Sequence, residues 1–91
     1  IQIILGKVRP LSRPLTEAHP QVLIIAHRSL VTLGILIALR ATDELKFHVT
    51  IARNNGLTDD EIAEVIYHAT GYAGFPAANA ACKVAREVIE G

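Results

Sequence analysis

A signal that ends a helix is followed almost at once by a signal that starts one in the middle of this chain. The run Asn54-Asn55-Gly56 suits a helix end, because glycine readily takes the left-handed conformation just past the last turn. The run Thr58-Asp59-Asp60-Glu61 is a capping box, in which the Thr58 hydroxyl and the Glu61 carboxylate each satisfy an orphan backbone N–H. The sequence therefore predicts two helices joined by a tight turn at this point.

The stretch from Glu44 to Pro76, which contains this turn, has the apolar spacing of two amphipathic helices. The predicted inward faces are Leu45, His48, Val49 and Ala52 in the first helix and Ile62, Val65, Ile66 and Ala69 in the second. The second helix is expected to stop at the run Gly71-Tyr72-Ala73-Gly74. Pro76 can then open a further helix, whose inward stripe is dominated by alanine and allows close helix packing.

A fourth helix is predicted ahead of this stretch, from Gln21 to Leu39, with Pro20 suited to its first turn. Apolar residues occupy every side of it, which predicts burial, with a subunit interface as the expected place. Its length approaches the roughly 20 residues of a membrane span. His27 and Arg28 oppose that alternative, because a central arginine costs about 2.5 to 3.5 kcal/mol on insertion.

The sequence predicts four helices with short turns, and no run of alternating apolar and polar residues is long enough to predict a strand. The chain is therefore placed in the all-α class. We expect one helical domain over residues 21–91, preceded by an extended arm over residues 1–20 that prolines keep out of helix. The apolar run Ile1–Leu5 of the arm is expected to lie along a groove, of its own chain or of a neighbouring subunit.

The composition favours self-association. A chain of 91 residues buries only about 60 to 65% of its unfolded surface, so a monomeric core would be marginal. Yet 51% of the residues are hydrophobic, and most of these are aliphatic because aromatic residues make up only 4%. The surplus apolar surface predicts an oligomer.

The charge pattern favours a small molecule or a protein as the partner. Nine basic and nine acidic residues are interspersed and the formal net charge is zero, so nothing indicates a nucleic acid or a membrane surface. The lone cysteine, Cys82, allows no internal disulfide and fits a reducing compartment, so a cytoplasmic location is expected.

The run Ile1–Leu5 lacks a preceding basic region and makes a poor signal peptide. The absence of an initiator Met suggests processing, truncation or an incompletely represented N-terminus.

Glu44 and His48 are the first candidates for chemistry, because four residues in a helix place both side chains on one face, one turn apart. A carboxylate beside an imidazole can fix its tautomer and suit it to acid/base work. The structural alternatives are a hydrogen-bonded core histidine and an exposed acid favoured by the helix dipole.

Arg28 is the next candidate, since a guanidinium within an apolar helix needs an acceptor, either a buried carboxylate or an anionic substrate. Glu64 and His68 repeat the four-residue spacing but lie off the apolar stripe, so a solvated pair competes with a supporting role in a site. Tyr72 could donate a hydrogen bond into a site or simply pack. The histidines lack HxH and HExxH spacing, and no phosphate-binding loop is present, so neither a metal nor a nucleotide cofactor is expected.

Four runs in this order resemble the carboxymuconolactone decarboxylase family over about residues 28–90. They are RSLVTLGILIAL from Arg28, ELKFH from Glu44, NGLTDDEIAEVI from Asn55 and YAGFPAA from Tyr72. The resemblance implies the helical fold of alkylhydroperoxidase D-like proteins, a homotrimer or homohexamer, and active sites near subunit interfaces. The peroxidase branch has a CxxC ahead of the histidine. Here Ala41 and Glu44 fill the cysteine positions, so a thiol peroxidase is disfavoured.

In the decarboxylase branch the resemblance implies cofactor-independent loss of CO2 from γ-carboxymuconolactone, or a related lactone acid, in aromatic catabolism and the β-ketoadipate pathway. His48 would then be the acid/base residue with Glu44 beside it, and Arg28, Tyr72 and His68 would bind the anionic substrate. Two alternatives stay open, another acid/base enzyme acting on a lactone or carbonyl compound and a non-catalytic oligomeric binding protein. The N-terminal third departs from the helical structure expected of the family, which leaves the substrate open.

Overall fold

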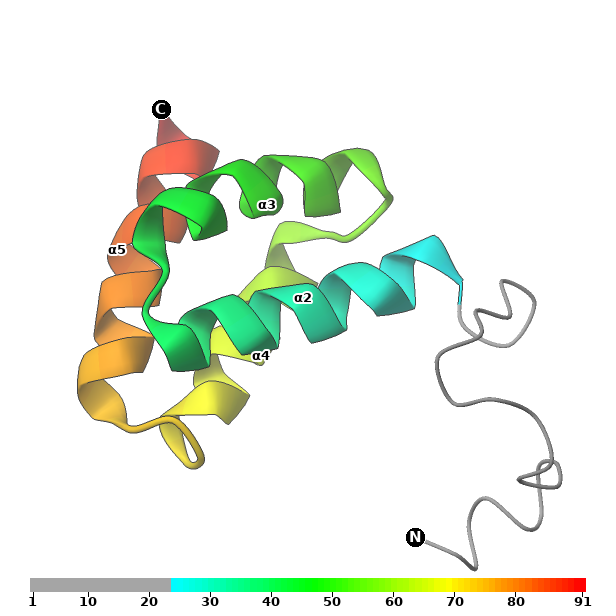
Figure 1. Cartoon of the computed structure of the whole chain (residues 1–91). Coiled ribbons are helices and arrows are strands. Elements are labelled where there is room, and N and C mark those ends of the chain that lie inside the picture. The colour runs from blue at the N-terminus through cyan, green and yellow to red at the C-terminus, as the bar shows by residue number, and fades with distance from the viewer. Residues whose placement is uncertain (1–23) are drawn as a thin grey trace, which may run out of the picture.

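The structure, a computed structural model, describes residues 24–91 and consists there of four α-helices without a strand (Figure 1). The helices are α2 (Ile25–Leu39), α3 (Thr42–Asn54), α4 (Asp59–Thr70) and α5 (Phe75–Glu90). This confirms the predicted all-α class. The predicted arm and the start of the predicted first helix, at residues 21–23, lie outside the described residues.

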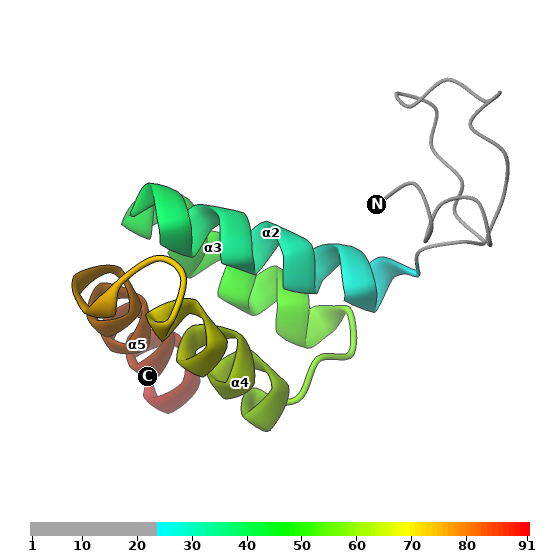
Figure 2. The same cartoon turned by 90° about the horizontal axis from the view of Figure 1, so that it is seen from below.

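The helices form two hairpins that pack on each other. Helices α2 and α3 run antiparallel side by side, and α4 and α5 form the second pair (Figures 1 and 2). Helix α2 packs on α4 and helix α3 on α5, so each hairpin covers the inner face of the other. The core lies between the two pairs.

The turns form as the sequence predicts. Gly56 has a φ of 102°, the conformation expected just past the end of α3. At the start of α4, the Thr58 N–H donates to Glu61 Oε1 at 2.8 Å and the Glu61 N–H donates to Thr58 Oγ1 at 3.0 Å, which completes the predicted capping box. Asn55 Nδ2 also donates to Ser29 Oγ at 2.9 Å, and this bond ties the end of α3 to the start of α2.

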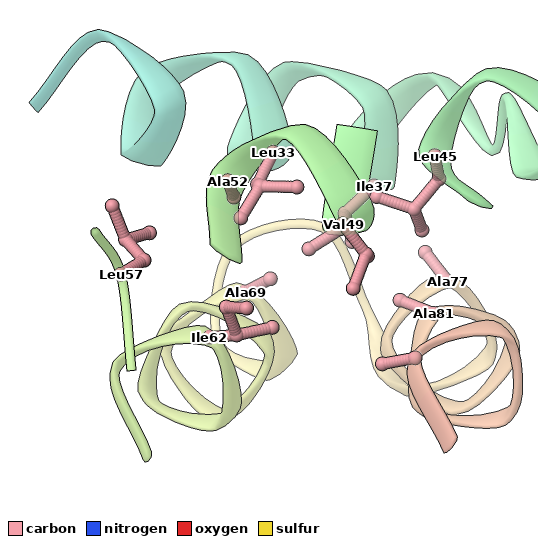
Figure 3. Packing of buried hydrophobic residues seen from close by; sticks show 11 residues of the cluster. Leu33, Ile37, Leu45, Val49, Ala52, Leu57, Ile62, Ala69, Ala77 and Ala81 are labelled. Carbon is pink, nitrogen blue, oxygen red and sulfur yellow. The ribbon is translucent and has the colours of Figure 1, made fainter. Parts of the chain in front are cut away.

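The core is aliphatic, and its α5 wall is built from alanine (Figure 3). Its buried members are Leu33, Ile37, Leu45, Val49, Ala52, Leu57, Ile62, Ala69, Ala77, Ala81 and Ala85. The predicted inward faces of α3 and α4 are therefore confirmed, with His48, Val65 and Ile66 only half-buried. Alanine contributes little burial per residue, but it lets the α5 backbone approach the other helices closely.

Helix α2 departs from the prediction at its start, and only one of its faces is buried within the chain. The backbone of Ile24 is extended, with ψ at 166°, so the helix begins at Ile25 and not at Gln21. Within the chain only Leu33 and Ile37 of this helix are buried, whereas Ile35 is 53% exposed and Leu39 is 70% exposed. The reason is that the other three helices all pack against one side of α2, and burial of the other face at a subunit interface stays a prediction. None of the described helices is long and apolar enough to cross a bilayer.

Candidate functional site

The predicted catalytic pair lies on α3. Glu44 is exposed in the first turn, and His48 is half-buried one turn later, on the edge of the face that buries Leu45 and Val49. Among the described residues no hydrogen bond or ion pair joins the Glu44 carboxylate to the His48 ring. The two groups therefore share a side of the helix, and both are open to a third molecule that reaches that side.

A hollow of about 690 Å³ lies between α2 and α4 on the described part of the chain. Its α2 wall is apolar and consists of Leu30, Val31, Gly34 and Ala38. The α4 side contributes Glu61, Glu64, Val65, His68 and Ala69, followed by Tyr72 and Ala73 from the turn after the helix. We call this hollow the α2–α4 groove. Its size and its pairing of an apolar wall with a few polar groups are typical of a small-molecule site.

The polar groups of the groove form a ladder along α4, because residues four apart lie one above another on a helix. The rings of His68 and Tyr72 are in contact, with centroids 4.8 Å apart and planes inclined at 41°. Glu61 is engaged in the capping box, which leaves Glu64, His68 and Tyr72 as groups that can meet a ligand.

The structure thus divides the five predicted site residues into two groups. It brings His68 and Tyr72 together in the α2–α4 groove, whereas Glu44, His48 and Arg28 do not line this groove. Arg28 lies near the start of α2 with an exposed side chain. Within the described part of the chain its side chain is therefore not buried, because this side of the helix faces outward, and its burial at a subunit interface stays a prediction.

Sequence reasoning weighed a supporting role for Glu64 against a solvated pair and left it out of the predicted site residues, yet it shares the groove with His68 and Tyr72. A signal for it existed in the spacing of four residues between Glu64, His68 and Tyr72, which continues one polar edge along the helix. In the part of the chain that the structure describes, no three His, Cys, Asp or Glu side chains gather closely enough to hold a metal ion.

The four-helix fold, the histidine on α3 and the polar ladder beside an apolar wall define a small all-α domain with a ligand-sized groove. The chain belongs to the carboxymuconolactone decarboxylase family, whose model matches residues 21–87. This match confirms the resemblance inferred from the four sequence runs.

Two curated relatives carry decarboxylase names. The chain is 51% identical over 63 residues to a 4-carboxymuconolactone decarboxylase of Acinetobacter baylyi, in an alignment that covers 69% of this chain and 47% of that protein. It is 44% identical over 62 residues to a nitrosuccinic acid decarboxylase of Metarhizium robertsii, covering 68% of this chain and 43% of that protein. The chain spans about half the length of the curated relatives it matches.

Proposed function

We propose that this chain forms the catalytic domain of a cofactor-independent carboxy-lyase that removes CO2 from a small carboxylic acid, with γ-carboxymuconolactone or a related lactone acid as substrate. The observation that carries the proposal is the 51% identity to a protein named 4-carboxymuconolactone decarboxylase. The nitrosuccinic acid decarboxylase supports the same reaction class on a different acid. The mixed apolar and polar lining of the α2–α4 groove suits such a compound.

In the proposed reaction the bond between the carboxylate carbon and the ring carbon that carries it breaks, and CO2 leaves. The electron pair of this bond stays on the ring and is delocalised into the lactone. A proton must then reach carbon. His48 delivers this proton, with Glu44 one turn away on the same side of α3 to hold the imidazole in the required tautomer. Arg28, His68 and Tyr72 bind the anionic groups of the substrate.

An assay on the full chain tests the proposal. The chain is incubated with γ-carboxymuconolactone, and release of CO2 is measured together with the loss of substrate absorbance. We expect one mole of CO2 to be released for each mole of lactone consumed. Nitrosuccinate serves as the competing substrate. Consumption of the lactone without CO2 would favour another acid/base reaction, and binding without consumption would favour a non-catalytic binding protein. Both results would contradict the proposed reaction.

We also propose a homo-oligomer, a trimer or a hexamer, as the working form. All four aromatic residues of the chain are largely exposed, with Phe47 at 75%, Tyr67 at 77%, Tyr72 at 83% and Phe75 at 70%. So much exposed aromatic surface on a small chain favours association with further copies. A neighbouring copy could also bring the His48 side of one chain to the groove of another, which a single chain does not do.

Light scattering on the purified chain measures the mass of the assembly directly. We expect a mass of three or six times 9.8 kDa at micromolar concentration. A monomer at every concentration would contradict the oligomer and would leave the two groups of site residues on separate surfaces.

A further inference from the structure

A glycine in the middle of α2 opens the α2–α4 groove. Gly34 lines the groove nine residues after the first residue of the helix, where glycine lowers helix stability relative to alanine. A Cβ built at Gly34 meets no described atom within 4 Å beyond its chain neighbours and its own helix backbone. Packing among the described residues therefore does not require glycine here, and the bare backbone at this position faces open groove.

The charges of the groove give it a direction. Glu61 and Glu64 lie toward the start of α4, and His68 and Tyr72 lie toward and past its end. Of the described residues that line the groove, none is Lys or Arg. A ligand carboxylate is repelled at the glutamate end, whereas the ring N–H of His68 and the hydroxyl of Tyr72 can donate to it at the other end.

We propose that the α2–α4 groove holds the ring of a cyclic carboxylic acid against the backbone at Gly34, with the carboxylate toward His68 and Tyr72, and that Gly34 sets how bulky this ring can be. This inference rests on the proposed function and names a residue that determines specificity within it. A flat ring can pack face-on against a backbone without a side chain, whereas an open-chain acid needs less width. A larger side chain at residue 34 should therefore weaken the binding of cyclic acids more than the binding of open-chain acids.

Binding of two stable probes to the full chain tests the proposal. The cyclic probe is 5-oxotetrahydrofuran-3-carboxylate and the open-chain probe is succinate, and NMR titration gives a dissociation constant for each. We expect Gly34→Leu to weaken binding of the cyclic probe about tenfold or more, and Gly34→Ala to weaken it less, because added methylenes fill the space of the ring. Succinate binding should change less than binding of the cyclic probe in both variants.

The matched control is Ala63→Leu, which adds similar bulk to an exposed position of α4 outside the groove. It should leave both dissociation constants unchanged. A melting temperature of Gly34→Ala at or above that of the wild type, together with weaker binding of the cyclic probe, would separate loss of space from loss of folding.

Three results would overturn the inference. These are cyclic-probe binding that Gly34→Leu leaves unchanged, equal losses for both probes, and a changed assembly mass in Gly34→Leu, which would place a helix of another copy in the groove. If the wild type decarboxylates the lactone acid and any of these results is found, the inference fails and the proposed function stands. If the wild type binds the cyclic probe with the expected dependence on residue 34 but releases no CO2 from any acid, the proposed function fails and the ring site stands.

Discussion

Replacing His48 by alanine is expected to lower decarboxylation of γ-carboxymuconolactone by a factor of about 10² to 10⁴, the range that a positioned acid/base group contributes. The proton that returns to carbon needs a donor at the site, and His48 is the imidazole of α3 on the side shared with Glu44. Because the ring is only half-buried, its removal leaves a small gap at the edge of the core. The measurement is the initial rate of CO2 release at saturating substrate.

The matched control is His27→Ala, which removes an exposed histidine of α2. It should retain the wild-type rate. Far-UV circular dichroism and the mass of the assembly must agree between both variants and the wild type, so that a lost rate reports lost chemistry. If His48→Ala keeps the assembly intact and decarboxylates at the wild-type rate, His48 is not the acid/base residue, and the groove histidine, His68, becomes the next candidate.

The sequence predicted the local structure well where a single residue type determines it. Gly56 is needed for a positive φ, and Thr58 with Glu61 closes a capping box from three residues apart. These signals depend on neighbours along the chain and hardly on the rest of the fold. They therefore predicted the end of α3 and the start of α4 almost to the residue.

The groove could not be predicted in the same way, because it depends on which helix faces meet in space. Spacing placed Glu64 and His68 together on one edge of α4, yet only the packing of α2 on α4 sets the apolar wall with Gly34 opposite them. The outer face of α2 is a second feature that the sequence could not place in space. An all-round apolar pattern predicts burial, but it cannot say whether the covering surface belongs to the same chain.

Replacing Leu33 by alanine is expected to lower the free energy of unfolding by about 2 to 5 kcal/mol, the range for deleting a fully buried leucine. Leu33 is 1% exposed, lies on the inner face of α2 and belongs to the core between the helical hairpins (Figure 3). A domain of this size has a total stability of only about 5 to 10 kcal/mol. The loss should therefore be seen as a fall in melting temperature of about 8 °C or more, at about 4 to 8 °C per kcal/mol.

The matched control is Leu39→Ala, the same change on the same helix at a side chain that is 70% exposed in the single chain. In dilute solution, where light scattering shows the monomer, it should change stability by no more than about 0.5 kcal/mol, as surface substitutions do. Thermal unfolding followed at 222 nm measures both variants. Equal losses in the monomer would contradict the core described for α2. A Leu39→Ala loss that appears only as the chain associates would instead show that the outer face of α2 is buried by another copy.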